Sequence, residues 1–304
     1  MISVAVLMST YNGEKYLKEQ LDSILFQKEV QVELFVRDDG SSDGTKNILS
    51  EYGNKFVNVH IDFATNVGVG NSFMNLLYSV PDSFDFYALA DQDDIWEENK
   101  LIEAVNRLDG KLLYASNQEC VDKYGNSIGL RYQEDAFIHL TPVSILECNM
   151  IAGCTMVLSN DFFRILTNEA NRPSPMLLRN RIHDVWIAMV ASLFNGIIYD
   201  KRSFIKYRQH ENNVVGASSS FSKKIKSRFK KLRHAEYRNG RSLLAQEIVE
   251  RFPQEAESYP LIKICSREKS FKGKIKILKN GRELRKYTNE NRFGFFIKVI
   301  FGLF

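Results

Sequence analysis

The amino-acid sequence predicts an α/β fold built around a mainly parallel β-sheet, followed by a basic region of different character. Two observations lead to this prediction. Over the first 110 residues, strand-like apolar segments alternate with amphipathic helix-like segments, as they do when helical crossovers connect parallel strands. In addition, 44% of the 304 residues are hydrophobic and 26% are charged, which is typical of a globular protein with a substantial core.

Strands and helices are expected in turn through this first part. Continuous or alternating apolar residues predict strands at 2–8, 30–36, 57–63 and 84–90. Apolar residues at helical spacing predict helices at 14–27, from Gly44 onward, at 71–79 and at 97–108. Ser41, Ser42 and Asp43 can cap the second helix. Beyond residue 110 the alternation loosens, and we expect short strands at 112–114, 155–158, 196–199 and 203–207, with a helix at 184–193.

The charges are unevenly divided along the chain. Residues 221–304 contain 22 Lys and Arg against 8 Asp and Glu, which leaves 19 against 29 in residues 1–220. The small residues at 216–220 look like a linker between the two parts. We therefore expect a catalytic or binding body at 1–216 and a basic, helical C-terminal region at 217–304.

The basic region is expected to lie on an anionic membrane surface. Residues 223–233 place Ile225, Phe229 and Leu232 on one helical stripe flanked by cations. The last twelve residues contain five phenylalanines and one charge. The alternative is that this segment packs on the protein itself or on a second copy, as a homodimer. Nucleic-acid binding is not expected, because no recognised nucleic-acid module accompanies the charge.

Other features favour a cytoplasmic protein. No apolar run approaches the roughly 20 residues that span a bilayer, and the apolar start lacks a cationic leader. The four cysteines show no C-x-x-C spacing, so we expect free, mostly buried thiols in a reducing compartment. Together with the basic region, this predicts peripheral attachment to the inner face of the cell membrane.

Carboxylates cluster where predicted strands or loops end. The three groups are Asp38-Asp39, the run 91–94 and Asp184. Ligands of α/β sheets bind beyond the carboxyl ends of the strands, and crowded carboxylates repel one another unless a cation or ligand compensates. Mg²⁺ and Mn²⁺ take one or two carboxylates together with phosphate oxygens. Asp91-x-Asp93 therefore predicts half of a metal site that a diphosphate completes, although aspartates can also merely cap turns.

Three segments resemble the motifs of bacterial family 2 glycosyltransferases. They are VLMSTYNG at 6–13, VRDDGSSDGT at 36–45 and ALADQDDIW at 88–96. Two more, IHDVW at 182–186 and YRQHENNVVG at 207–216, resemble the rhamnosyltransferase-like branch. The resemblance covers about residues 2–215. It implies the Rossmann-like GT-A fold, with a nucleotide-binding half at about 1–110 and an acceptor-binding half at about 111–216.

The resemblance also implies roles for individual residues. It assigns nucleotide-sugar binding to Thr10, Tyr11, Asp38, Asp39, Asn66, Gly68 and Asp91. Within this set, Asp39 is expected to accept a hydrogen bond from the pyrimidine ring, with Asp38 supporting it. Asp93 and His210 are expected to hold Mn²⁺ or Mg²⁺, and Asp94 is a less favoured metal ligand.

Asp184 is the general base that the resemblance implies, and His183 and Trp186 are expected to contact the acceptor. A carboxylate is ionised at neutral pH and can take the proton of an attacking hydroxyl. Direct displacement of this kind inverts the anomeric centre and needs no covalent intermediate. The alternative for Asp184 is that it only caps the helix that follows.

These expectations lead to a metal-dependent inverting glycosyltransferase that builds a bacterial surface polysaccharide. Rhamnose from dTDP-rhamnose is the preferred donor, followed by galactose or glucose from UDP, and the acceptor is a saccharide or a lipid-linked saccharide. One alternative is an NAD-dependent oxidoreductase. The segment Gly68-Val69-Gly70 resembles part of a dinucleotide fingerprint, but Phe73 replaces its third glycine. The other alternative is a degenerate transferase that acts only as a binding module.

Overall fold

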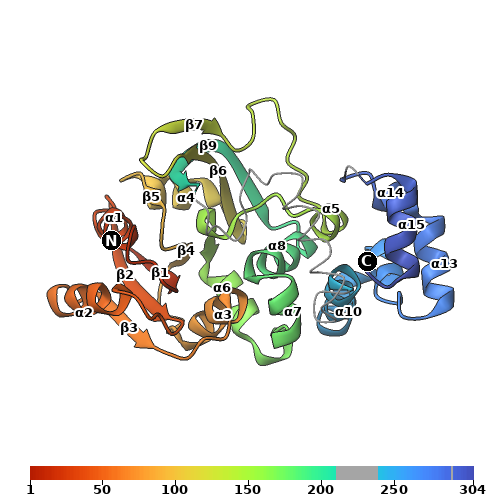
Figure 1. Ribbon diagram of the computed structural model, residues 1–304, viewed down its shortest axis with the longest axis horizontal. Helices are drawn as coiled ribbons and strands as arrows, with labels where there is room; N and C mark the ends of the chain where they lie inside the picture. The colour runs from red at the N-terminus through yellow and green to blue at the C-terminus, as the bar shows by residue number, and fades with distance from the viewer. Residues whose placement is uncertain (210–238, 289) are drawn as a thin grey trace. The chain divides into compact units, whose positions relative to one another are not determined.

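The computed structural model describes residues 1–209, 239–288 and 290–304, and the chain divides into two compact units (Figure 1). The first unit comprises residues 1–137, 151–167 and the described residues from 196 to 209. The second comprises 138–150, 168–195 and the described residues from 239 onward. The division therefore does not follow a single boundary near residue 216, because two internal segments join the C-terminal helices.

The first unit contains a sheet of nine strands among its described residues. The strands are β1 (Ile2–Thr10), β2 (Val30–Asp38), β3 (Val59–Phe63), β4 (Phe86–Ala90), β5 (Ile95–Trp96), β6 (Leu113–Val121), β7 (Ser127–Leu130), β8 (Val157–Ser159) and β9 (Ile197–Arg208). Their order is β3-β2-β1-β4-β8-β6-β9-β5, with β7 paired to β6. The pairs from β3 to β4 and the pair β6–β9 are parallel. The predicted mainly parallel sheet is thus confirmed.

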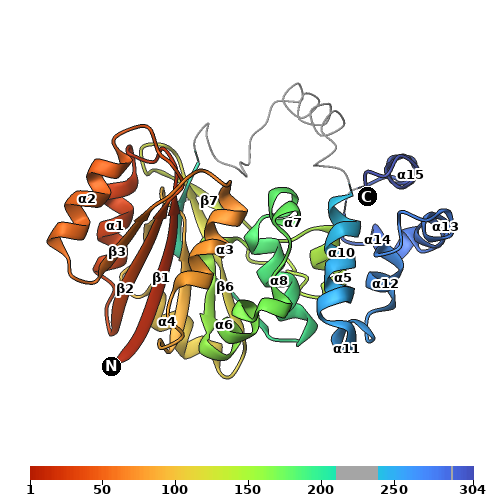
Figure 2. The same ribbon diagram turned by 90° about the horizontal axis from the view of Figure 1, so that it is seen from below.

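Helices cover both faces of this sheet, as Figure 2 shows. They are α1 (Leu17–Leu25), α2 (Thr45–Lys55), α3 (Val69–Ser79), α4 (Lys100–Leu108) and α6 (Asn160–Thr167). Val4, Val6 and Met8 of β1 pack in one core with apolar residues of α1, α2 and α4. Because side chains alternate along a strand, Ala5 and Leu7 point to the other face, and both are fully buried. This explains why residues 4–8 of β1 form an unbroken apolar run.

One prediction about the strands was wrong. The segments 196–199 and 203–207 are not separate strands but parts of β9. Asp200, Lys201 and Arg202 look like a loop in the sequence, yet they lie within the strand, where the pairing with β6 shifts register. The Asp200 carboxylate is buried and accepts hydrogen bonds from the backbone and the guanidinium of Arg202. Local pairing therefore lets the charged residues stay in the strand.

The second unit is helical. Its helices are α5 (Pro142–Glu147), α7 (Pro175–Asn180), α8 (His183–Leu193), α10 (Gly240–Arg251), α11 (Pro253–Ala256), α12 (Pro260–Cys265), α13 (Phe271–Lys279), α14 (Gly281–Leu284) and α15 (Arg292–Ile300). Helix α8 is buried on nearly every side, as its almost continuous apolar sequence requires. Arg241 of α10 pairs with Glu147 of α5 at 3.0 Å and with Glu290 at 3.1 Å, which ties three chain segments together.

Two further expectations concern the whole of the described chain. None of its helices is long and apolar enough to cross a bilayer. All four cysteines are free, and three of them (Cys120, Cys154 and Cys265) are buried. The prediction of free and mostly buried thiols is therefore confirmed.

Candidate active site

The carboxyl ends of three parallel strands bring the predicted nucleotide-binding residues to one edge of the sheet. Thr10, the last residue of β1, lies opposite Asp38, the last residue of β2. Met8 of β1 lies opposite Ala90, which ends β4 and precedes Asp91. The sequence places these polar residues directly after buried apolar strands, so their side chains gather where a ligand of an α/β sheet would bind.

Asp38 is fully buried and uses both carboxylate oxygens inside the protein. It accepts hydrogen bonds from Thr10 Oγ1 at 3.1 Å, from Ser41 N at 2.9 Å and from Ser41 Oγ at 2.5 Å. Charge-assisted bonds of this kind fix the loop that follows β2. This arrangement fits the supporting role expected of Asp38.

Asp39 joins the loop after β2 to the loop before α3. Its carboxylate pairs with Arg37 at 2.5 Å and accepts hydrogen bonds from Val67 N at 3.0 Å and from Gly68 N at 3.0 Å. Gly68 has φ +85°, a backbone conformation that residues other than glycine rarely adopt. Asn66 precedes these two residues and is exposed. Three of the residues that the resemblance assigns to the nucleotide are thus neighbours.

Gln92 contributes to the site although no role was predicted for it from the sequence. The amide group of its side chain pairs with the backbone of Tyr11: Tyr11 N donates to Oε1 at 2.8 Å and Nε2 donates to Tyr11 O at 3.1 Å. Gly13 allows this approach, since a Cβ at residue 13 would lie 2.3 Å from Gln92 Oε1. Tyr11 itself is half-exposed, which suits a ring that stacks on a base. The sequence signal that could have identified Gln92 is its position as the one amide within the acidic run 91–94.

The acidic loop after β4 contributes to a group of three candidate metal ligands. Asp91, Asp94 and Cys154 each offer a ligand atom, and these atoms lie within 4.8 Å of one another. Asp94 is fully buried, and its Oδ2 accepts no hydrogen bond from the described part of the chain. Burial, together with the charges of Asp93 and Asp91, holds the pKa of the Asp94 carboxyl well above its ordinary value.

This donor set fits a divalent cation. Carboxylate oxygens suit Mg²⁺ and Mn²⁺, and the Cys154 sulfur would favour a softer transition-metal ion. Cys154 was expected only as a buried thiol, because nothing in the sequence links it to the acidic loop. Asp93 is half-buried and is not part of this group. His210 lies outside the described residues, so the ligand roles of Asp93 and His210 stay predictions.

Lys100 supplies a competing counter-charge. Its side chain is buried, with Nζ 3.6 Å from the centre of the Trp96 ring. Burial lowers the pKa of Lys100 to about 7, although interactions with Cys154 and Asp94 act to raise it. Burial therefore disfavours the charged form of this lysine beside the acidic loop.

Arg208, at the end of β9, fixes the acidic loop in place. Its backbone N donates to Asp94 Oδ1 at 3.2 Å, and its Nε donates to the Asp93 carbonyl at 3.1 Å. The same guanidinium pairs with Glu19 of α1 at 2.6 Å and lies 4.4 Å from the centre of the Tyr16 ring. Only 3% of the Arg208 surface is exposed, so this buried side chain connects the acidic loop to α1. Arg208 belongs to the motif at 207–216, but no role was predicted for it from the sequence.

Asp184, the predicted base, belongs to the second unit. Helix α8 begins at His183 with Ile182 as its N-cap, so Asp184 lies in the first turn and is not the cap. Its Oδ1 accepts a hydrogen bond from Val185 N at 2.7 Å. The positive end of the helix dipole favours an ionised carboxylate there. Burial lowers the pKa of Arg181 to about 10, and the negative charge of Asp184 partly opposes this shift. The expected proximity of Asp184 to Asp39 and Asp93 stays a prediction.

His183 and Trp186, the predicted acceptor-binding residues, are buried within the second unit. Burial lowers the pKa of His183 to about 3, so the ring is neutral at physiological pH. The Trp186 ring centre lies 6.2 Å from that of Phe252. Both side chains therefore pack the helix that carries Asp184, and their contact with an acceptor stays a prediction.

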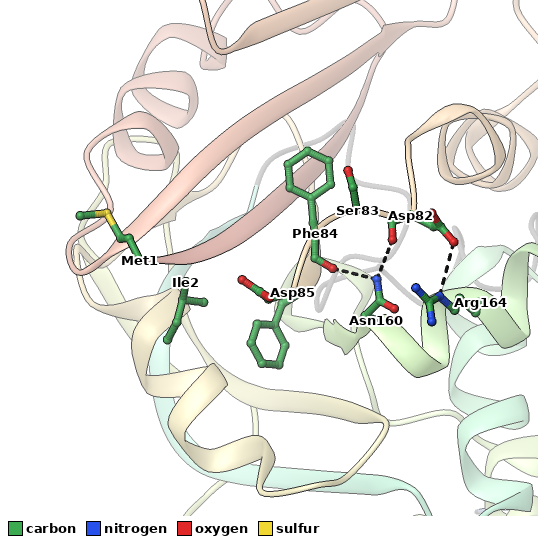
Figure 3. A pocket seen from close by; sticks show the side chains of 9 residues that line it. Met1, Ile2, Asp82, Ser83, Phe84, Asp85, Asn160 and Arg164 are labelled. Carbon is green, nitrogen blue, oxygen red and sulfur yellow. Dashed lines mark hydrogen bonds and ion pairs between the residues drawn. The ribbon is translucent and has the colours of Figure 1, made fainter.

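A separate hollow of about 850 Å³ lies at the opposite edge of the sheet (Figure 3). It is lined by Met1, Ile2, Asp82, Ser83, Phe84, Asp85, Phe86, Asn160 and Arg164. Asn160 donates to the Asp82 carbonyl at 3.0 Å, and Arg164 pairs with the Asp82 carboxylate at 3.4 Å. The amino ends of β1 and β4 border this hollow, so it is not part of the site formed at their carboxyl ends.

Comparisons with known proteins agree with this picture. The family model described as "Glycosyl transferase family 2" matches residues 5–148. The chain is 33% identical over 231 residues to the dTDP-rhamnosyl transferase RfbG of Shigella flexneri, and the match covers 72% of this chain and 77% of that protein. It is 26% identical over 226 residues to an uncharacterized glycosyltransferase of Rickettsia typhi, with 71% and 66% covered.

Solved structures show a similar fold. S. aureus TarS 1–349 in complex with UDP matches with a TM-score of 0.59 at 18% identity, and the match covers 98% of this chain and 81% of that one. A second TarS structure, in complex with UDP-GlcNAc, matches with a TM-score of 0.57 at 16% identity.

Proposed function

The chain belongs to glycosyl transferase family 2, its fold is the predicted GT-A type, and on this premise we propose that it transfers rhamnose from dTDP-rhamnose. The acceptor is a hydroxyl group of a saccharide or lipid-linked saccharide, and the product serves a bacterial surface polysaccharide such as a capsule. The observation that carries the donor assignment is the 33% identity to a dTDP-rhamnosyl transferase over 72% of the chain. A UDP-hexose, with galactose or glucose, is the second candidate, because the TarS structures hold UDP and UDP-GlcNAc.

The strand-end residues provide the nucleotide site in this proposal. We assign to Asp39 the hydrogen bond from the pyrimidine N–H and to the half-exposed Tyr11 ring the stacking on the base, which the anchoring of the Gly68 loop by Asp39 supports. Thr10 and Asp38 keep these residues in position through buried hydrogen bonds. Asp91 follows β4 at the same edge, and we assign it to the ribose and the diphosphate.

Asp184 removes the acceptor proton in the proposed reaction. The hydroxyl oxygen attacks the anomeric carbon from the face opposite the leaving diphosphate, so the configuration inverts. A carboxylate near that hydroxyl takes the proton as the new bond forms. Asp184 lies in the first turn of α8, where the positive end of a helix dipole interacts favourably with a carboxylate.

A divalent cation, Mn²⁺ or Mg²⁺, is part of the proposal. Asp91 and Asp94, with Cys154, would hold it on the geometry of the described residues, whereas the resemblance favours Asp93 with His210. When bound, the cation would offset the charge that develops on the leaving diphosphate.

Two isosteric variants separate these ligand sets. If the described group binds the metal, Asp94→Asn should weaken Mn²⁺ binding at least about tenfold, with Asp93→Asn close to the unmodified protein. Calorimetric titration with MnCl2 in the presence of dTDP measures both affinities. Glu97→Gln, an exposed change in the same region, is the control. Weakening by Asp93→Asn alone would instead support the ligand set implied by the resemblance, and no loss in either variant would contradict both.

The donor assignment is tested by sugar transfer from a panel of activated sugars. We expect turnover with dTDP-rhamnose to exceed that with UDP-glucose or UDP-galactose at least about tenfold. Thermal stabilisation by dTDP, UDP, GDP and NAD, each with and without Mn²⁺, reports binding without an acceptor. Preference for a UDP-hexose would support the second candidate, and stabilisation by none of the nucleotides would contradict the nucleotide site itself.

We also propose that the enzyme works in the cytoplasm, peripherally attached to the inner face of the cell membrane, where lipid-linked acceptors are met. The basic C-terminal region supports this placement. A homodimer is the competing use of that region, and residues 223–233, where a basic helix was predicted, lie outside the described residues.

A further inference from the structure

Two neighbouring helices of the second unit expose apolar side chains. On α15, Phe293, Phe296 and Ile300 are spaced as i, i+3 and i+7 and lie on one face. On α13, Phe271 and Ile275 are spaced as i and i+4. The exposed fraction reaches 78% for Phe271 and 72% for Phe293. Isolated exposed apolar residues are normal, but a cluster of large ones indicates a binding surface.

The opposite side of α15 packs into the protein. Phe295 and Val299 are buried, as is Phe304 at the end of the chain, with Phe295 and Phe304 in edge contact at 5.6 Å. The aromatic C-terminal segment is therefore split between a packed side and an exposed side. Helix α15 is held in one orientation, so its exposed phenylalanines are presented by a folded element.

Both exposed stripes belong to one pair of neighbouring helices. Helices α13 and α15 lie side by side in both views (Figures 1 and 2), and Lys274 Nζ donates to the Ile300 carbonyl at 2.7 Å. Phe301, just after α15, is also 69% exposed. We call this surface the aromatic face, and it consists of Phe271, Ile275, Phe293, Phe296, Ile300 and Phe301.

Cations flank the aromatic face. Lys272, Lys276 and Lys279 are spaced as i, i+4 and i+7 on α13, which places an exposed basic stripe beside the apolar one. None of the three forms an ion pair with a described residue. Residues 259–304 as a whole contain 12 Lys and Arg against 3 Asp and Glu. The surface is therefore both apolar and strongly positive.

A shallow groove continues the positive charge between α12 and α13. Its volume is about 270 Å³, and Lys276 and Arg267 contribute to its lining. Lys263, which also lines it, pairs with Glu257 at 2.5 Å. The other two cations of the groove, Lys276 and Arg267, form no ion pair with a residue that the structure describes, so both are available to an anionic group.

We propose that the aromatic face docks on an anionic lipid bilayer, with its phenylalanines at the boundary of the acyl chains and its lysines among the headgroup phosphates. An amphipathic surface that combines large apolar residues with Lys and Arg binds membranes in this manner. Charge selects this occupant over a second copy of the chain, because pairing two aromatic faces would bring two basic stripes together. The inference rests on the peripheral attachment proposed above and deepens it by naming the residues that bind the bilayer, and it does not depend on which donor is used.

Vesicle binding of the full chain tests the proposal. Vesicles of phosphatidylcholine with phosphatidylglycerol are compared with vesicles of phosphatidylcholine alone by co-sedimentation. We expect Phe293→Ser with Phe296→Ser to lower the partition coefficient at least about tenfold. Lys272→Gln, Lys276→Gln and Lys279→Gln together should lower it on the order of 100-fold on the anionic vesicles only, and added salt should do the same.

Phe26→Ser is the matched control, since Phe26 is a 68% exposed phenylalanine on the first unit. Thermal unfolding confirms that each variant is folded, and transfer to a water-soluble acceptor confirms that the catalytic site is intact. Equal vesicle binding by the wild type and the Phe293/Phe296 variant overturns the proposal. It is also overturned if that variant only converts a dimer to a monomer in light scattering. Loss of transfer with vesicle binding retained would count against the proposed function instead.

Discussion

Replacing Asp184 by asparagine is expected to lower the rate of sugar transfer by about 10²- to 10⁴-fold while the nucleotide still binds. Asparagine keeps the shape of the side chain and can still accept the hydrogen bond from Val185 N, but it cannot take a proton. The effect should therefore appear in kcat, with little change in the KM for the donor. Steady-state kinetics and calorimetric titration with dTDP measure the two quantities.

Asp161→Asn is the matched control for this variant. Asp161 is an exposed carboxylate in the first turn of α6, just as Asp184 is a carboxylate in the first turn of α8. Both substitutions remove a charge that interacts favourably with a helix dipole, at a cost of about 0.3–1 kcal/mol. Only a base should affect chemistry, so normal turnover by Asp184→Asn would show that another group takes the proton.

Replacing Asp39 by asparagine should affect both stability and nucleotide binding. The carboxylate neutralises Arg37, whose side chain is only 8% exposed, so its loss leaves a buried charge without its counter-ion. We expect the free energy of unfolding to fall by about 3 kcal/mol. Affinity for dTDP should fall as well, because the loop of Val67 and Gly68 loses its charged acceptor. Urea unfolding and calorimetric titration measure these effects.

A double variant separates the two roles of Asp39. Adding Arg37→Met to Asp39→Asn removes the stranded charge and should restore much of the stability, while dTDP binding stays weak. Asp62→Asn, on the exposed end of β3, is the control and should change neither quantity. If dTDP bound to Asp39→Asn as tightly as to the wild type, Asp39 would not belong to the nucleotide site.

The sequence was most informative where a strand is buried on both faces and ends in polar residues. Strands β1 and β4 have this character, and β2 alternates between apolar and polar residues before it ends at the buried Asp38. Their positions and the gathering of Thr10, Asp38 and Asp91 could therefore be predicted. The short helices α5 and α7 could have been predicted too. Thr141 and Ser174 cap them, and each is followed by a proline at the first helical position, which is a recognised start signal.

The remaining site residues could not be predicted because their roles depend on contacts between distant parts of the chain. Gln92 meets Tyr11 across 81 positions, and Arg208 meets Asp94 across 114. In the sequence, Cys154 looks like any buried cysteine. Its position near Asp91 follows only from the fold. Periodicity and local motifs carry no information about such pairings, which only the sheet order establishes.

The interleaved course of the chain limits how the protein can be shortened. Helix α8 packs on the C-terminal helices: the Trp186 ring meets that of Phe252, and Tyr259 Oη donates to the Leu193 carbonyl at 3.4 Å. A truncated form designed to end after the sheet would therefore remove the helices that support α8 and its proposed base, Asp184. Expression trials that delete the basic end to improve solubility should then yield a chain that retains its nucleotide pocket but no longer glycosylates.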